Sequence, residues 1–206
     1  DKPQEVADHY EKLWNEMNSD DMRGDQSYKR SYYENVRERY NKEHDPLDFM
    51  FIDRTCFNGL IRYNSKGEFN SPYHLNRNGI RPNVLRTIVS EWSDLLKLND
   101  VRFNCNSYDN ISPKCNDFIY LDPPYANTNG MYNGDFDNDG FFKWLKELKC
   151  KFALSYDGIS GEIDNTYKVP SDVYDKHVYV KSGNSSFKRI KQSDNNAIVY
   201  ESLYLG

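Results

Sequence analysis

Four consecutive residues, Asp122-Pro123-Pro124-Tyr125, place a carboxylate, a rigid backbone and an aromatic ring directly after a run of strand-forming residues. The two prolines remove two backbone N–H donors and fix φ at about −65°, so the turn is stiff and the carbonyl oxygen of Pro123 points away without a nearby donor in the chain. The carboxylate and this carbonyl can each accept one N–H of an exocyclic amine, and Tyr125 can stack on its ring. The tetrapeptide indicates a pocket for a planar amine such as a nucleobase; a simple turn after a strand is the alternative.

Such a pocket suits reaction at an aromatic amine, which is a poor nucleophile because its lone pair is delocalised into the ring. Two acceptors that draw the hydrogens out of the ring plane localise the lone pair and aim it at an electrophile on the other side. This is catalysis by orientation and electrostatic placement, and it needs no strong base before the attack. A base inside a duplex cannot reach the pocket, so the target has to be flipped out of the stack.

Alternating helices and strands are predicted to position this corner. Apolar periodicity and capping residues predict helices over 1–17, 28–40, 46–52, 83–98 and 141–148, and strands over 101–105, 117–121, 151–158, 177–182 and 196–205. The helix over 83–98 is expected to bury Leu85, Ile88, Val89, Trp92 and Leu96. This order predicts an α/β fold whose sheet has parallel strands and an antiparallel edge formed by the last two strands. The corner would lie at the carboxyl end of a buried strand, where parallel sheets bind ligands.

The segment from Asn58 to Arg81 is rich in Gly, Asn, Ser, Pro and aromatic residues without a period, which predicts a loop or a short hairpin. Arg and Asn read guanine and adenine edges with two hydrogen bonds, whereas Lys favours phosphate, and Tyr73 could wedge into the gap left by a flipped base. A solvated polar loop is the alternative. The DNA-contacting residues predicted here are Arg62, Asn64, Lys66, Asn70, Tyr73, His74 and Arg77.

Composition and charge narrow the class of protein. The 206 residues carry a net charge of −5, which argues against nonspecific coating of nucleic acid, while an aromatic share of 15% indicates a folded core. Five basic residues and no acid lie between Lys176 and Ser193; of these, Lys188 and Arg189 are expected to contact phosphate, with unpaired surface charges as the alternative. Scattered cysteines predict reduced thiols, mostly buried, and no metal site. No window predicts a membrane span, so we expect a cytoplasmic protein without a membrane partner.

The chain resembles the Dam-type (D12 class) DNA adenine-N6 methyltransferases, which use S-adenosylmethionine. The matching stretches are TCFNGLIRYNSKGEFNSPY (55–73), FNCNSY (103–108), FIYLDPPY (118–125), FALSYDG (152–158) and the tail NSSFKRI…VYESLYL. This resemblance implies a Rossmann-like class I methyltransferase sheet with an inserted, mainly helical DNA-recognition lobe. It divides the chain into N-terminal helices (1–42), the DNA-recognition insertion (43–97) and the catalytic α/β part (98–206).

The resemblance also assigns roles to residues. Asp122 to Tyr125 would form the catalytic motif of an enzyme that methylates adenine N6 in double-stranded DNA. Asp122, Ser107, Tyr108 and Asp1 would bind the cofactor, Asp1 through the ribose hydroxyls. Asn133 and Gly134, with Tyr132, could close over the flipped base, or form a loop without such a role. A cognate restriction enzyme in a bacterial or phage-type system is an implied partner. Methylation of cytosine N4 is the closest alternative reaction, since the same geometry serves any exocyclic amine.

One feature of the family is missing from the sequence. None of the 11 glycines forms the G-x-G turn that lets the backbone approach the cofactor, so the first two strands of the sheet and their turn are absent from the chain. We expect an N-terminal part of the protein to supply them. One alternative is a second polypeptide that completes the cofactor site, without which this chain would be an inactive DNA-binding subunit. Another is a protein that does without the cofactor.

Overall fold

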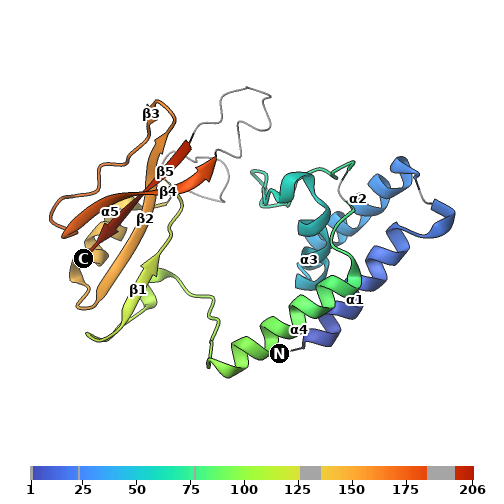
Figure 1. Ribbon diagram of the computed structural model, residues 1–206, viewed down its shortest axis with the longest axis horizontal. Coiled ribbons are helices and arrows are strands. Elements are labelled where there is room, and N and C mark those ends of the chain that lie inside the picture. Colours follow the sequence, from blue (N-terminus) through green and yellow to red (C-terminus); the bar gives the residue numbers. More distant parts are fainter. Residues whose placement is uncertain (1, 23, 77, 126–135, 185–197) are drawn as a thin grey trace. The chain divides into compact units, whose positions relative to one another are not determined.

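The computed structural model describes residues 2–22, 24–76, 78–125, 136–184 and 198–206, and Figure 1 gives the order of the elements. The chain forms two compact units, Asp1–Asn104 and Cys105–Gly206. We call them unit 1 and unit 2. Unit 1 is helical, and unit 2 contains the β-sheet.

Unit 1 is built from α1 (Pro3–Met17), α2 (Gln26–Glu43), α3 (Pro46–Thr55) and α4 (Pro82–Leu98), with short 3-10 helices η1 (Asp20–Met22) and η2 (Phe57–Gly59). Local chemistry fixes where the helices begin. The side chain of Asp25 accepts hydrogen bonds from two backbone N–H groups of α2, and Asp45 does the same for one of α3. Pro46 and Pro82 occupy first turns, where a missing N–H costs nothing. The four predicted helices are confirmed.

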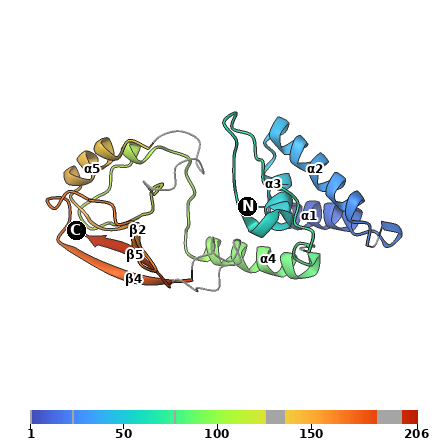
Figure 2. The ribbon, with the colours of Figure 1, turned by 90° about the horizontal axis from the view of Figure 1, so that it is seen from above.

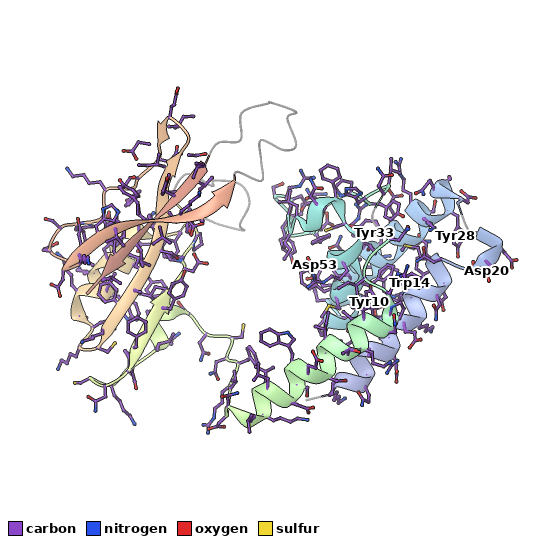
Figure 3. All side chains as sticks on the ribbon, viewed as in Figure 1. Tyr10, Trp14, Asp20, Tyr28, Tyr33 and Asp53 are labelled. Atoms are coloured by element: carbon purple, nitrogen blue, oxygen red, sulfur yellow. The ribbon has the colours of Figure 1, made fainter. Side chains whose placement is uncertain are left out.

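The core of unit 1 is largely aromatic. Tyr10 and Tyr33 are fully buried (Figure 3), and their hydroxyls donate to the carbonyl oxygens of Ile80 and Ser71 at 2.9 and 2.8 Å. These bonds satisfy the polar end of each ring, which is the usual condition for burying a tyrosine. The core residues are Tyr10, Leu13, Met17, Tyr33, Val36, Phe51, Ile52, Cys56, Phe69, Tyr73 and Leu85. The boundary predicted at residue 42 therefore falls inside one packed core.

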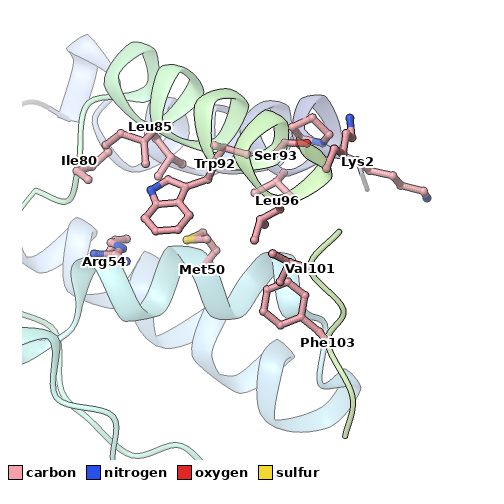
Figure 4. Close-up of a pocket in the computed structure, with 15 residues that line it drawn as sticks. Lys2, Met50, Arg54, Ile80, Leu85, Trp92, Ser93, Leu96, Val101 and Phe103 are labelled. Carbon is pink, nitrogen blue, oxygen red and sulfur yellow. The ribbon is translucent and has the colours of Figure 1, made fainter. Parts of the chain in front are cut away.

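The apolar face of α4 is less buried than predicted. Leu85 is buried, but Ile88 and Trp92 are 36% and 59% exposed. With Leu96 and the α3 residue Met50, they line a groove of about 580 Å³ in unit 1 (Figure 4). The helix prediction was right, but of the five residues predicted to be buried only Leu85 is buried, while Val89 and Leu96 are half-buried. Ile88 and Trp92 are exposed because in the described part of unit 1 no element covers this stretch of the helix.

Unit 2 contains one sheet in the order β1-β2-β5-β4, and β3 pairs with β2 off this path. The strands are β1 (Phe118–Leu121), β2 (Lys151–Ser160), β3 (Ile163–Asp164), β4 (Lys176–Asn184) and β5 (Ile198–Leu205); the 3-10 helix η3 (Tyr108–Asn110) precedes them. β1 and β2 are parallel, and β5 is antiparallel to both β2 and β4. The predicted mixture of a parallel pair and an antiparallel edge is confirmed.

One face of this sheet is covered by α5 (Asn138–Glu147), as Figure 2 shows. Phe141, Phe142 and Leu145 of the helix share a core with the β2 residues Phe152 and Leu154. The helix begins at Asp137, whose side chain accepts a hydrogen bond from the N–H of Gly140 at 3.0 Å. β2 is thereby held at the centre of the unit.

Three strand predictions need correction. Residues 101–105 are not a strand, and Val101 and Phe103 are 46% and 81% exposed; a strand needs a neighbour to pair with, and in the described part of the chain none lies beside them. β1 is an edge strand rather than a buried one, with Phe118 and Tyr120 64% and 62% exposed. β2 continues past the expected turn to Ser160 because Gly158, which lacks a side chain, lets the backbone of β5 pass close by.

The cysteines are free thiols, of which Cys56 and Cys150 are buried while Cys105 and Cys115 are exposed. The expectation that most are buried is right for two of the four. None of the described helices combines the length and apolar character needed to cross a membrane.

Candidate functional site

The corner Asp122–Tyr125 follows directly from the end of β1, at its carboxyl end. The parallel register pairs Leu121 with Leu154, so Ser155 on β2 is the next residue beside Asp122. Its hydroxyl donates to Oδ1 of Asp122 at 3.0 Å and lies 3.3 Å from the carbonyl oxygen of Leu121. Asp122 itself is exposed. One oxygen of the carboxylate is therefore oriented by the sheet, while the group stays accessible to a ligand.

Tyr125 is half-buried and its ring lies against that of Tyr156 on β2, with centroids 5.9 Å apart and planes inclined by 41°. Tyr156 is in turn anchored by a hydrogen bond from its hydroxyl to Oδ1 of Asn138, the first residue of α5. Burial raises the pKa of the Tyr125 phenol, and the negative charges of Glu201 and Asp122 raise it further. The ring therefore stays neutral at physiological pH, as stacking on a base requires.

The chemical capacity of the corner follows from these positions. An exposed carboxylate can accept hydrogen bonds from an amine or an ammonium group. Pro123 and Pro124 supply carbonyl oxygens without N–H donors, and a neutral tyrosine ring adds an apolar plane. The motif residues Asp122, Pro123, Pro124 and Tyr125 thus lie together at the carboxyl end of β1, beside its parallel neighbour β2. The arrangement suits a flat molecule that carries an amino group.

Two residues predicted to bind the cofactor also lie in unit 2. Tyr108 packs on an aromatic group beside α5, with ring centroids 6.0 Å from Phe136 and 5.2 Å from both Phe141 and Trp144. Burial raises the pKa of its phenol. Ser107 precedes the 3-10 helix η3 and is exposed. Tyr108 is therefore held by packing, whereas Ser107 is available at the surface.

In unit 1, the predicted DNA-contacting segment is a short hairpin in which Tyr63 and Phe69 form a bridge. Arg62 and Asn70 face each other across it: Nε of Arg62 donates to Oδ1 of Asn70 at 2.8 Å, and the N–H of Asn70 donates to the carbonyl oxygen of Arg62 at 2.9 Å. Arg62 is exposed. The structure thus brings these two predicted base-reading residues together.

Asn64 has a structural role at the tip of this hairpin. Its Oδ1 accepts hydrogen bonds from the backbone N–H groups of Lys66 and Glu68, at 2.9 and 3.0 Å, and its amide donates to the Glu68 carboxylate at 2.8 Å. Gly67 takes the positive φ of 76° that the turn requires. The turn leaves Lys66 exposed at the tip, where a basic side chain can meet phosphate.

Tyr73 is placed differently from its predicted role. Its side chain is 5% exposed, its ring centroid is 5.6 Å from that of Tyr33, and it belongs to the core of unit 1. A ring that fills the core cannot also fill a gap in DNA, so the prediction that Tyr73 wedges into the duplex is wrong for this structure. His74 is half-buried and stacks on Phe57, with centroids 5.2 Å apart.

Several predicted residues lie outside the described part of the chain. They are Asp1 for the cofactor, Arg77, Lys188 and Arg189 for DNA, and Tyr132, Asn133 and Gly134 for closure over the base.

Sequence reasoning missed residues that support both sites. Asn41 on α2 holds the hairpin, since its amide donates to the carbonyl oxygen of Phe69 at 3.1 Å and its Oδ1 accepts from the N–H of Phe69 at 2.8 Å. Ser155 holds Asp122 in unit 2. No local pattern marks Asn41, because its partner is 28 residues away. Ser155 could have been found by aligning the strands over 117–121 and 151–158 as a parallel pair.

Comparison with known proteins agrees with this geometry. The sequence profile of the family described as D12 class N6 adenine-specific DNA methyltransferase matches residues 2–198. Modification methylase StsI of Streptococcus sanguinis is 33% identical over 135 residues, covering 58% of this chain and 20% of that protein. Type II methyltransferase M.MjaIII of Methanocaldococcus jannaschii is 31% identical over 153 residues, covering 64% and 51%. DNA adenine methylase of Escherichia coli (strain K12) is 35% identical over 101 residues, covering 46% and 34%. The matched region thus spans between 20% and 51% of these relatives.

Proposed function

Because the chain belongs to the D12 class of N6 adenine-specific DNA methyltransferases, we propose that it methylates N6 of adenine in a short DNA sequence, using S-adenosylmethionine, after the base has been flipped. The observation that carries this proposal is the exposed carboxylate of Asp122 beside two prolines and a half-buried tyrosine ring at the end of β1. A base inside a duplex could not reach such a corner, so flipping is part of the proposal.

The residues of the corner are proposed to have different roles in the reaction. Asp122 and the carbonyl oxygen of Pro123 each accept one hydrogen of the adenine amino group, which turns its lone pair out of the ring plane. Tyr125 stacks on the base and fixes its orientation. The amino nitrogen would then take the methyl group that a bound donor supplies, with the electron pair of the carbon–sulfur bond staying on sulfur, and would afterwards lose one proton to water. The rate gain comes from placement and not from a strong base.

The described residues fit the proposed cofactor in their chemistry. S-adenosylmethionine, when bound, supplies a methyl group attached to a positively charged sulfur. Asp122 is an exposed carboxylate suited to the cofactor's ammonium group, and Ser107 offers an exposed hydroxyl near the aromatic packing of Tyr108. Asp1 and a segment carrying the glycine-rich turn, on an N-terminal part of the protein or a second polypeptide, are proposed to complete the site.

DNA recognition is proposed to lie in unit 1. The hairpin around Tyr63 and Phe69 presents Arg62 and Lys66 as exposed cations. Arg62 is proposed to read a base edge and Lys66 to contact phosphate, according to the preferences of the two side chains. We further propose that unit 1 contains the recognition insertion of a Rossmann-like fold. The relatives named modification methylase and Type II methyltransferase suggest a cognate restriction enzyme as a partner.

The product of the reaction tests this proposal. The complete gene is expressed in a host that lacks adenine methylation, and its genomic DNA is digested to nucleosides for mass spectrometry and sequenced for modified bases. We expect N6-methyladenine at one short sequence, and none in cells expressing the Asp122→Ala variant. Methylated cytosine N4 without methylated adenine, or no modified base from a well-folded protein that binds the cofactor and DNA, would contradict the proposal.

A further inference from the structure

We propose that Ser155 is the positioning residue of the catalytic corner, holding the carboxylate of Asp122 in the geometry that methyl transfer needs. This inference rests on the proposed function. Ser155 lies on β2, the central strand, and is 3% exposed. Its backbone is therefore fixed by strands on both sides, which makes it a more rigid reference point than the corner itself.

The hydroxyl of Ser155 both donates and accepts hydrogen bonds. A serine hydroxyl has one hydrogen to donate and two lone pairs to accept with. Its hydrogen points to Oδ1 of Asp122 at 3.0 Å, with the carbonyl oxygen of Leu121 as a longer second acceptor at 3.3 Å. The hydroxyl of Tyr120 donates to Oγ at 3.1 Å. One buried oxygen thus connects the carboxylate of the motif to the sheet.

The hydrogen bond between Ser155 and Asp122 has a consequence for the reaction. The bond to Asp122 fixes the rotation of the carboxylate, and hydrogen bonds to a charged acceptor are stronger than those between neutral groups. It occupies one carboxylate oxygen and directs the other toward the ligand. Since Ser155 is buried and its hydroxyl is hydrogen-bonded to Asp122, it acts on the reaction through that carboxylate.

Tyr120 completes the arrangement from outside. Its ring is 62% exposed on the face of the sheet opposite α5, yet its hydroxyl reaches the buried serine. By occupying one lone pair of Oγ, it leaves the serine hydrogen directed at the carboxylate. The ring of Tyr120 is too exposed to be stabilised by apolar burial alone. The hydrogen bond of its hydroxyl to Ser155 gives a reason for a tyrosine at this position of the edge strand.

Four variants test the inference: Ser155→Ala, Ser155→Thr, Tyr120→Phe and, as a matched control, Ser202→Ala. Ser202 is a buried serine on the neighbouring strand β5 whose hydroxyl has no hydrogen bond to the motif in the described part of unit 2. The protein expressed from its complete gene is used, and the single-turnover rate of methyl transfer, KM for DNA and DNA affinity are measured on each variant.

We expect Ser155→Ala to lower the transfer rate by about 10–100-fold, the range typical of a misplaced reacting group, with KM for DNA and DNA affinity unchanged. Ser155→Thr should restore most of the rate because it keeps the hydroxyl, and Ser202→Ala should transfer at the wild-type rate. Tyr120→Phe should show a smaller loss. If Ser155→Ala does not fold, Tyr120→Phe decides the matter: a reduced rate supports the inference, and a wild-type rate overturns it.

Failure of this inference is distinguishable from failure of the proposed function. If wild type methylates adenine, Asp122→Ala is inactive and Ser155→Ala reacts at the wild-type rate, the positioning role is wrong while the function stands. Equal losses in Ser155→Ala and Ser155→Thr would also overturn it, since a retained hydroxyl should help. A wild-type protein that binds DNA and cofactor without methylating adenine contradicts the function itself.

Discussion

The guanidinium of Arg62 donates a hydrogen bond to the side-chain oxygen of Asn70, 2.8 Å away, and a second one to the backbone carbonyl of the same residue at 3.3 Å. Arg62 and Asn70, which were predicted separately as DNA contacts, are therefore hydrogen-bonded to each other. Asn70 thus fixes the orientation of the Arg62 guanidinium across the hairpin. A bidentate contact with guanine requires such a fixed orientation. Recognition of a base by Arg62 should depend on Asn70.

Arg62→Ala is expected to lower discrimination between the cognate site and a site with one changed base pair by about 1–3 kcal/mol. Asn70→Ala should lower it less, and the double variant should lose less than the sum because the two residues act together. Lys66→Ala is the control, for which we expect a similar loss of affinity for all sequences. Competition binding with cognate and mismatched duplexes measures both quantities; a uniform loss in Arg62→Ala would show that Arg62 contacts only phosphate.

Tyr125→Ala is expected to weaken capture of the flipped base by about 1–3 kcal/mol, the usual contribution of stacking on an aromatic ring. Tyr125→Phe should keep most of it, because the ring and its contact with Tyr156 remain. A fluorescent adenine analogue at the target position reports the flipped fraction. Tyr179→Ala, which removes an exposed tyrosine of β4, is the control. Wild-type flipping in Tyr125→Ala would refute the stacking role.

The buried carboxylate of Asp48 should contribute to the stability of unit 1. Burial alone would raise its pKa, but hydrogen bonds from Arg39 and His9 outweigh this and lower it below the ordinary value. Both oxygens are engaged at 2.6 Å by Arg39, and the His9 ring lies 2.8 Å away. Asp48→Asn should lower the free energy of unfolding at neutral pH by about 1–3 kcal/mol, toward the low end because the Arg39 side chain is 41% exposed.

The sign of the pH dependence follows from the lowered pKa of Asp48. Its contribution is fully present above the unfolded pKa of about 4 and is lost as pH falls through the lower folded value. Urea unfolding of wild type and Asp48→Asn at neutral and acidic pH should therefore give curves that converge in acid. Asp8→Asn, which removes an exposed pair with Arg86, should change stability by less than about 1 kcal/mol. A difference between wild type and Asp48→Asn that grows in acid would contradict this account.

In unit 2, we expect His177 to make stability depend on pH in a different range. Its ring stacks on Tyr204 with centroids 4.3 Å apart, and burial lowers its pKa below the ordinary value of 6.5. Since the unfolded chain binds the proton more readily, stability is retained above pH 6.5 and decreases as pH falls toward the folded pKa. His177→Phe should lose this decrease. Thermal unfolding across the window measures it, and an equal decrease in the variant would assign the effect to another group.

The helices and strands could be predicted from the sequence more accurately than the burial of their side chains. Capping by Asp45 and the apolar spacing of α1 are local signals, so the helices could be predicted. Burial of Tyr73 and exposure of Trp92 depend on which distant elements cover them, and no local pattern contains that information. For the same reason the motif Asp122–Tyr125 could be recognised from its own residues. The role proposed for Ser155 depends on the register between β1 and β2.

The central claim is that Asp122 prepares the adenine amine for methyl transfer, and the single-turnover rate of Asp122→Ala tests it most directly. The rate is measured together with DNA affinity on the same preparation. We predict that transfer falls by at least about 10²–10³-fold, as when one preorganised electrostatic contact is removed, while DNA affinity stays close to wild type. A variant that transfers methyl groups at nearly the wild-type rate would contradict the account.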